Sequence, residues 1–162
     1  IPGLVPGIHL SACSGVCGEL DPGDEHRDDN VELGWTMKLL IYAMAGGALG
    51  SGARHLVNIG MGRWLGSGFP WWTVFVNVTG CFLMGVLIES LALKFQGSID
   101  LRTLLATGVL GGYTTFSAFS LDFSYLMQRG DHMAAGFYLL GSVGLSILGL
   151  YAGLWLTRIV LT

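Results

Sequence analysis

The sequence predicts an all-α membrane protein with four transmembrane helices, the third of which is broken at mid-membrane. Three observations lead to this fold class: the composition, four long apolar stretches, and a run of helix-weakening residues inside the third stretch. Of the 162 residues, 52% are hydrophobic, only 12% are charged and 26 are glycines. Soluble domains carry about 25% charged residues, so a membrane protein is the better interpretation.

Four apolar stretches approach or exceed the roughly 20 residues that a helix needs to cross the hydrocarbon layer. The predicted spans are residues 39–57, 71–93, 101–127 and 133–156. Short polar connections separate them at residues 58–70, 94–100 and 128–132. The tryptophans near span ends, where an interfacial aromatic belt lies, are Trp64, Trp71, Trp72 and Trp155. Residues 37–162 are therefore predicted to form one transmembrane domain.

Residues 1–36 differ in composition from the rest of the chain. They hold seven acidic residues and one basic residue, Arg27, whereas residues 37–162 hold four acidic and seven basic residues. This segment lacks the basic end and the apolar run of a signal peptide, and it cannot bury enough surface to fold alone. We expect a disordered acidic tail, in which Cys13 and Cys17 match no standard zinc spacing.

Basic residues flank the four spans in nearly equal numbers on the two sides of the membrane. Four spans place both termini on one side, which then holds Lys38, Lys94, Arg102 and Arg158. The other side holds Arg54, Arg63 and Arg129. Orientation normally follows a clear excess of Lys and Arg on the cytoplasmic side, and four against three is hardly an excess. The count supports insertion both ways up and insertion in one orientation about equally.

Small residues give the first span a face that lets another helix approach closely. They are Gly46, Gly47, Gly50 and Gly52. Neither this run nor the later GMGRWLG follows a strand in a βαβ unit, so a nucleotide-binding loop is excluded. We expect no nucleic-acid partner.

The segment GGYTTFSAFS, residues 111–120, is a poor helix former at the middle of the third span. Gly111 and Gly112 supply backbone freedom, and the β-branched Thr114 and Thr115 disfavour closing the next turn. Non-helical backbone at that depth survives only beside protein or a water-filled path. A break there leaves carbonyls that suit a cation and N–H groups with the positive end of a helix dipole. The alternative is that the glycines serve close packing, with the threonine hydroxyls bonding back to the helix.

Aromatic and hydroxyl side chains follow the weak segment. Phe116 and Phe119 are three residues apart and share a helix face, and Thr115 and Ser120 add hydroxyls nearby. Phenyl edges carry partial positive charge, so two rings can offer an anion a polar contact that holds no water. A phenylalanine pair at this spacing is also common in protein cores.

Polar residues in the second and fourth spans match this segment. Asn77 lies within the second span, and the fourth offers Tyr138, Ser142 and Ser146. Such residues are often interhelical glue, but here they also form an uncharged, donor-rich track. We place Glu89 and Asp122 toward helix ends, so no acid lies in mid-span, where proton-coupled transporters usually need one. Cys81, alone in an apolar run, is interpreted as packing there as a small hydrophobe.

Three motifs resemble those of the CrcB/Fluc family of fluoride channels. GGYTTFSAFS is similar to the third-helix signature, FVNVTG around Asn77 to the second-helix motif, and GGALGSGAR, which ends at Arg54, to the first-helix pattern. The resemblance runs from Met37 to about the C-terminus and leaves residues 1–36 outside it.

The resemblance implies a four-helix subunit that assembles as an antiparallel, dual-topology homodimer with two fluoride pores in the lipid bilayer. Asn77 would belong to the polar track, Phe116 and Phe119 to the paired rings, and Ser142 and Ser146 to the fourth-helix wall. The main-chain carbonyls of Gly111 and Thr114 would hold a structural sodium ion at the dimer centre. The sequence departs from the family at Ala118, where Thr or Ser is usual, and at Tyr113, where a smaller apolar residue is common.

The function that the resemblance implies is passive fluoride export, which lowers cytoplasmic fluoride across the inner membrane of a prokaryote. Fluoride would enter as HF, ionise inside and leave down its gradient, with no enzymatic step. A dual-topology coupled exporter would want a carboxylate in its first span, and residues 39–57 contain none. An intramembrane enzyme using Ser117 with His132 would need to bridge about 22 Å of helical rise.

Overall fold

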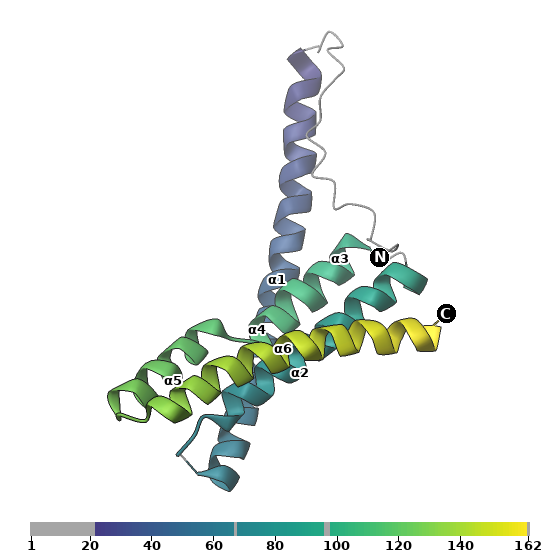
Figure 1. Ribbon diagram of the computed structural model, residues 1–162. Coiled ribbons are helices and arrows are strands. Elements are labelled where there is room, and N and C mark those ends of the chain that lie inside the picture. The colour runs from purple at the N-terminus through teal and green to yellow at the C-terminus, as the bar shows by residue number, and fades with distance from the viewer. Residues whose placement is uncertain (1–21, 67, 96–97, 162) are drawn as a thin grey trace. The chain divides into compact units, whose positions relative to one another are not determined.

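The computed structural model describes residues 22–66, 68–95 and 98–161, and in these residues it contains helices and no strand (Figure 1). The chain divides into two units, Ile1–Trp35 and Thr36–Thr162. In the first unit the structure describes residues 22–35, which are helical. Residues 1–21 lie outside the described residues, so the expected disorder there stays a prediction.

The described helices follow one another in the order of the predicted spans. They are α1 (Pro22–Leu65), α2 (Trp71–Ser90), η1 (Leu91–Phe95), α3 (Ile99–Arg102), η2 (Thr103–Leu110), α4 (Gly111–Tyr113), α5 (Phe116–Gln128) and α6 (His132–Leu161). The segments η1 and η2 are π-helical, and η2 continues α3 into α4 without a turn.

Three of these helical stretches in the described residues are long and apolar enough to cross a membrane. They are Trp71–Leu93, Ile99–Gln128 and His132–Leu161. These stretches contain the second, third and fourth predicted spans. The first predicted span is helical within α1 but is not among them, because its glycines, with Arg54 and His55, lower its mean hydropathy. A crossing at residues 39–57 therefore stays a prediction.

The helices α2 and α6 run in the same direction and pack along one another (Figure 1). Glycines make this approach possible: a Cβ at Gly149 would lie 3.1 Å from the carbonyl oxygen of Val78, and one at Gly153 would overlap that of Phe82. Toward the far end of the pair, Arg158 Nε donates to Glu89 Oε1 at 2.7 Å. The pair is thus held at backbone contact distance, with an ion pair near its C-terminal end.

A tight turn at Gly130 joins α5 to α6. Gly130 has φ +79, and its N–H donates to the carbonyl of Met127 at 3.0 Å, while the N–H of Asp131 donates to that of Leu126 at 3.1 Å. This is the Schellman arrangement, which ends a helix at a left-handed residue that glycine adopts at low cost. It turns the chain back, so that α5 and α6 lie as antiparallel neighbours (Figure 1).

Glycines also bring α1 against the first half of the third span. A Cβ at Gly46 would lie 2.9 Å from Gly108 Cα, and one at Gly50 would lie 2.8 Å from the backbone nitrogen of Tyr113. The predicted small-residue face is therefore in use at Gly46 and Gly50, whereas a Cβ at Gly52 would meet no atom within 4 Å.

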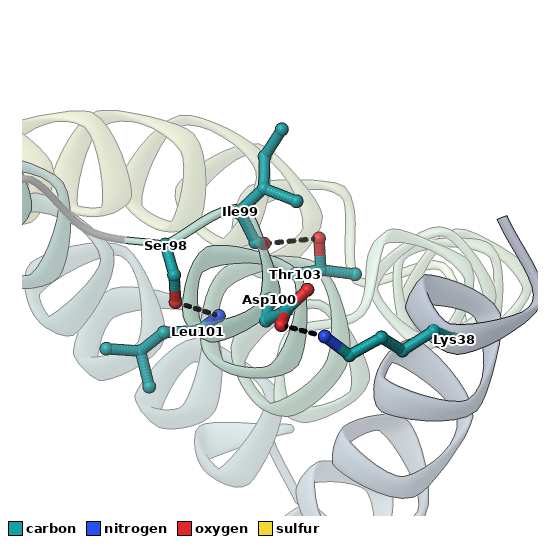
Figure 2. Close-up of polar contacts among 6 residues, drawn as sticks. All are labelled: Lys38, Ser98, Ile99, Asp100, Leu101 and Thr103. Atoms are coloured by element: carbon teal, nitrogen blue, oxygen red, sulfur yellow. Dashed lines mark hydrogen bonds and ion pairs between the residues drawn. The ribbon is translucent and has the colours of Figure 1, made fainter. Parts of the chain in front are cut away.

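An ion pair links α1 to the start of α3 (Figure 2). Lys38 Nζ donates to Asp100 Oδ2 at 2.5 Å, in the turn where the Ser98 hydroxyl caps α3 by accepting from the Leu101 N–H at 3.4 Å. The hydrogen bond to the Asp100 carboxylate raises the pKa of Lys38 above its ordinary value of 10.5. The protonated Lys38 side chain therefore stabilises the folded state through this ion pair. That contribution is complete with respect to Lys38 below its ordinary pKa, and it is lost only as the pH rises through the raised pKa.

Replacing Gly50 by alanine is expected to destabilise the fold by about 1–3 kcal/mol, because the new methyl group would overlap the backbone of the third span. Gly52→Ala is the matched control: it lies in the same helix, meets open space, and is expected to be neutral or slightly stabilising. Thermal unfolding of the two purified variants measures the difference. Equal midpoints would contradict the close contact.

Candidate functional site

The third span is interrupted between α4 and α5, as the sequence predicts. Thr114 has φ −78 and ψ 157, and Thr115 has φ −153 and ψ 119, so both are extended while their neighbours are helical. The expectation that Gly111 and Gly112 supply the backbone freedom is wrong, because both lie within the helical α4. The β-branched threonines adopt the extended conformation instead, which suits their restricted side chains.

Gly112 serves close packing rather than the break. A Cβ there would lie 2.6 Å from the carbonyl oxygen of Gly47 in α1, and the hydroxyl of Ser51 donates to the Gly112 carbonyl at 3.4 Å. The Thr114 hydroxyl donates back to the carbonyl of Leu110 at 3.0 Å. Both features of the packing alternative are therefore present alongside the break.

The side-chain amide of Asn77 holds the extended backbone of Thr115. Asn77 Oδ1 accepts from the Thr115 N–H at 2.8 Å, and Asn77 Nδ2 donates to the Thr115 carbonyl at 3.1 Å. Thr115 is buried, so both backbone groups would otherwise lack water. Asn77 in α2 thus replaces the helical acceptor that the Thr115 N–H loses at the break, and it adds a donor to the carbonyl of Thr115, which begins α5 as its N-cap.

The carbonyls of Gly111 and Thr114 are among those that the break releases from their helical donors. In a continuous helix the N–H of Thr115 would donate to Gly111 and that of Ala118 to Thr114. Here the first donates to Asn77, and the second donates to the Thr115 hydroxyl at 3.2 Å, which caps α5. Arg54 Nη1 approaches the Thr114 carbonyl at 3.3 Å.

One cavity, which we call the ring cavity, has a volume of about 310 Å³ and lies between α2, the break, α5 and α6. Its lining residues are Asn77, Cys81, Thr114, Thr115, Phe116, Phe119, Ser142, Val143, Ser146 and Ile147. Of the described residues, none that lines this cavity is charged. Six residues of the predicted fluoride pathway meet there: Asn77, Thr115, Phe116, Phe119, Ser142 and Ser146.

Two phenyl rings and one buried hydroxyl are the features of the ring cavity that bear on anion binding. The ring centroids of Phe116 and Phe119 are 5.4 Å apart at 40°, and Phe116 is 76% exposed while Phe119 is 5% exposed. The hydroxyl of Ser142 is buried and has no hydrogen-bond partner among the described residues. A buried hydroxyl without a partner is costly, so the position of Ser142 in the cavity wall favours a ligand that accepts a hydrogen bond from it.

Two of the predicted pathway residues lie outside the ring cavity. The hydroxyl of Ser120 is exposed and donates back to the carbonyl of Phe116 at 3.0 Å. Tyr138 is buried behind Phe119, with ring centroids 5.1 Å apart in a stacked arrangement. Spacing along the helix placed Ser120 near the rings but did not reveal where its hydroxyl donates.

The phenolic group of Tyr138 contacts a carboxylate that the sequence analysis did not include in the site. Tyr138 Oη donates to Asp122 Oδ2 at 3.1 Å, and the hydroxyl of the buried Thr73 donates to the same oxygen at 2.6 Å. Asp122 lies three residues after Phe119 on α5, a spacing that places both on one face. That spacing is the signal that could have revealed it.

A second cavity, the arginine cavity, has a volume of about 510 Å³ and shares only Thr115 with the ring cavity. Its lining residues are Ser51, Arg54, His55, Asn58, Thr115, Ser117, Ala118 and Leu121. The expectation that Arg54 marks a membrane face is not what the structure gives, since its guanidinium lies at the break. Ala118 belongs to this cavity, so a hydroxyl missing there is not missing from the ring cavity.

Tyr113 is accommodated by a glycine on α2. A Cβ at Gly80 would lie 3.1 Å from Tyr113 Cδ1, and the Tyr113 hydroxyl shares a hydrogen bond of 3.2 Å with that of Thr79.

Among the described residues there is no group of three or more His, Cys, Asp or Glu side chains that could hold a metal ion.

Replacing Asn77 by alanine is expected to leave the buried N–H of Thr115 without its partner, at about 1–3 kcal/mol, and to remove one donor to the Thr115 carbonyl. Asn58→Ala is the control, because the amide oxygen of Asn58 has no partner in the described structure. Thermal unfolding should show the larger loss for Asn77→Ala. A loss no greater than that of the control would argue against the role of Asn77 in holding the break.

Comparison with known proteins shows the family to which the chain belongs. Residues 41–154 match the family described as CrcB-like protein, Camphor Resistance (CrcB). A protein of Chelativorans sp. named fluoride-specific ion channel FluC is 55% identical over 122 residues, 75% of this chain and 98% of that protein. Proteins with the same name from Nitrobacter winogradskyi and Rhodospirillum centenum are 48% identical over 126 residues and 51% over 122. These cover 78% and 75% of this chain, and 98% and 97% of those proteins. The chain therefore belongs to the CrcB-like family.

Proposed function

We propose that this chain is the subunit of a fluoride-selective ion channel that exports fluoride passively and so lowers its concentration in the cytoplasm. The observation that carries the proposal is the ring cavity, which is lined by two phenyl rings and by Ser142, whose buried hydroxyl has no hydrogen-bond partner among the described residues. Fluoride is a small anion that accepts strong hydrogen bonds. The similarity to proteins named fluoride-specific ion channels supports the same anion.

The chemistry of the ring cavity suits conduction rather than tight binding. Ser142 and Ser146 offer hydroxyl donors, and Phe116 and Phe119 offer ring edges with partial positive charge. With no charged side chain in the described wall, the anion meets replacements for its water shell but no fixed counter-charge. Conduction needs binding that is favourable enough for entry and weak enough for exit.

We further propose that α1 supplies a fourth crossing and that two subunits assemble as an antiparallel homodimer. The contacts of Gly46 and Gly50 with the third span support the crossing of α1. The exposure of Phe116 on a cavity wall supports a second copy beside it. The charge balance supports dual topology less than the sequence suggests, because removing Arg54 from the three basic residues on one side leaves two against four.

The structural sodium ion at the dimer centre is a proposal of the same kind. It is supported by the carbonyls of Gly111 and Thr114, whose helical donors are diverted to other acceptors. A carbonyl oxygen has two lone pairs, so Thr114 can accept from Arg54 and still offer one to an ion. Backbone carbonyls released by a broken membrane helix are typical sodium ligands.

The proposed location of the protein is the cytoplasmic membrane of a prokaryote, with lipid around the exposed apolar residues.

The central test is fluoride efflux from liposomes that contain the purified protein, compared with chloride efflux. Phe116→Ile and Phe119→Ile keep bulk and remove the ring edge, so each is expected to cut fluoride flux by about tenfold or more. Phe137→Ile is the matched control, because Phe137 is exposed on α6 and does not line the ring cavity. If both ring variants assemble normally and their fluoride flux is unchanged, the anion must take a route that does not pass the two rings. Efflux that required a proton gradient would favour a coupled exporter.

The antiparallel arrangement predicts that the C-terminus lies on both sides of native membranes. A single cysteine added there, in a variant without Cys13, Cys17 and Cys81, is expected to react with an impermeant reagent from either side. A cysteine added before Met37 should give the same two-sided result, because four crossings keep both ends together. Labelling from one side only would rule out dual topology.

A further inference from the structure

Cys81 is the one ionisable side chain among the described residues that line the ring cavity, and the proposed function does not use it. Cys81 is a free cysteine and is only partly buried. From the sequence, Cys81 is predicted to pack as a small hydrophobe. The cavity gives it a different environment.

The position of Cys81 follows from helical spacing. Cys81 lies four residues after Asn77 on α2, and Ser146 lies four residues after Ser142 on α6, so each pair shares a face. The two helices run in parallel, and all four residues line the ring cavity. Cys81 therefore lies one helical turn beyond Asn77 in the wall that α2 forms, while the two serines belong to the wall that α6 forms.

An independent observation indicates that this cavity holds a ligand. Ser142 is 3% exposed, and its hydroxyl has no hydrogen-bond partner among the described residues. A hydroxyl buried in this way is expected to donate to a species that occupies the cavity. Whatever passes Ser142 on its way along α6 also passes the wall to which Cys81 belongs.

We propose that Cys81 is a modification site in the wall of the fluoride route, where uncharged electrophilic thiol reagents attach and obstruct the anion. The inference rests on the proposed function and adds a residue and a class of inhibitor to it. An uncharged reagent suits a cavity with no charged residue in its described wall. A group attached at Cys81 occupies part of the roughly 310 Å³ that the anion would use.

The chemistry needs no reactant beyond the reagent. With an alkyl methanethiosulfonate, the thiolate of Cys81 attacks the sulfenyl sulfur, a new S–S bond forms, and the S–S bond to the sulfonyl group breaks. Methanesulfinate leaves with the electron pair, and the thiol proton goes to water. Dithiothreitol reverses the modification by thiol–disulfide exchange, which restores the free thiol.

The experiment uses the full chain with Cys13→Ser and Cys17→Ser, so that Cys81 is the only thiol. Liposomes are treated with methyl and then with benzyl methanethiosulfonate, and both fluoride efflux and the intact mass are measured. We expect one adduct, partial loss of flux with the methyl group, loss of most of the flux with the benzyl group, and recovery after dithiothreitol. The matched control adds Cys81→Ser: whatever its own flux, that flux is expected not to respond to either reagent.

Each of the remaining outcomes contradicts either the inference about Cys81 or the proposed channel function, but not both. A complete adduct at Cys81 with unchanged flux overturns the inference and leaves the channel function intact. A thiol that reacts only after denaturation also overturns it, because the cavity is then closed to the reagent. Absence of fluoride efflux before treatment, in a normally assembled protein, contradicts the proposed function instead. If the Cys81→Ser protein does not assemble, Cys81→Ala supplies the same control.

Discussion

The pair of hydrogen bonds between Asn77 and Thr115 is the constraint on which the site depends. Two residues of the third span are extended, and their backbone groups need partners that a helix would otherwise provide. Asn77 supplies both a donor and an acceptor to Thr115 from the neighbouring helix. Few side chains other than Asn and Gln offer both in one planar group. Because the break is held at this point, Thr114 and Phe116 are fixed on either side of it.

The helices α2 and α6, which pack against each other, form two walls of the ring cavity. Glycines bring the two backbones together at Gly149 and Gly153, toward the end marked by the Glu89 and Arg158 ion pair. Closer to the N-terminal end of α6, Tyr138 stacks on Phe119 of α5, and Phe119 lines the ring cavity.

Sequence reasoning located the break and the rings because both depend on local chemistry. Consecutive threonines disfavour a helix wherever they lie, and two phenylalanines three residues apart share a face in any helix. It misassigned Gly112 because a glycine serves flexibility and close approach equally well, and only the position of Gly47 on α1 decides between them. The sequence predicts Arg54 to be a flanking charge for a similar reason, since the contact with Thr114 joins residues 60 apart in sequence and no local pattern indicates it. The exposed hydroxyl of Ser120 shows the same limit, because bonding back to the helix removed it from the cavity.

The partners of the break also precede it in the chain, and this order matters during synthesis. Arg54 and Asn77 both belong to segments that leave the ribosome before residues 111–120. When the third segment enters the bilayer, the amide that Thr115 requires is already within the membrane on α2. The extended residues can therefore pass directly from the insertion machinery to their partners, without a period in which unpaired peptide groups face lipid. The same segment placed first in the chain would have no such partner waiting for it.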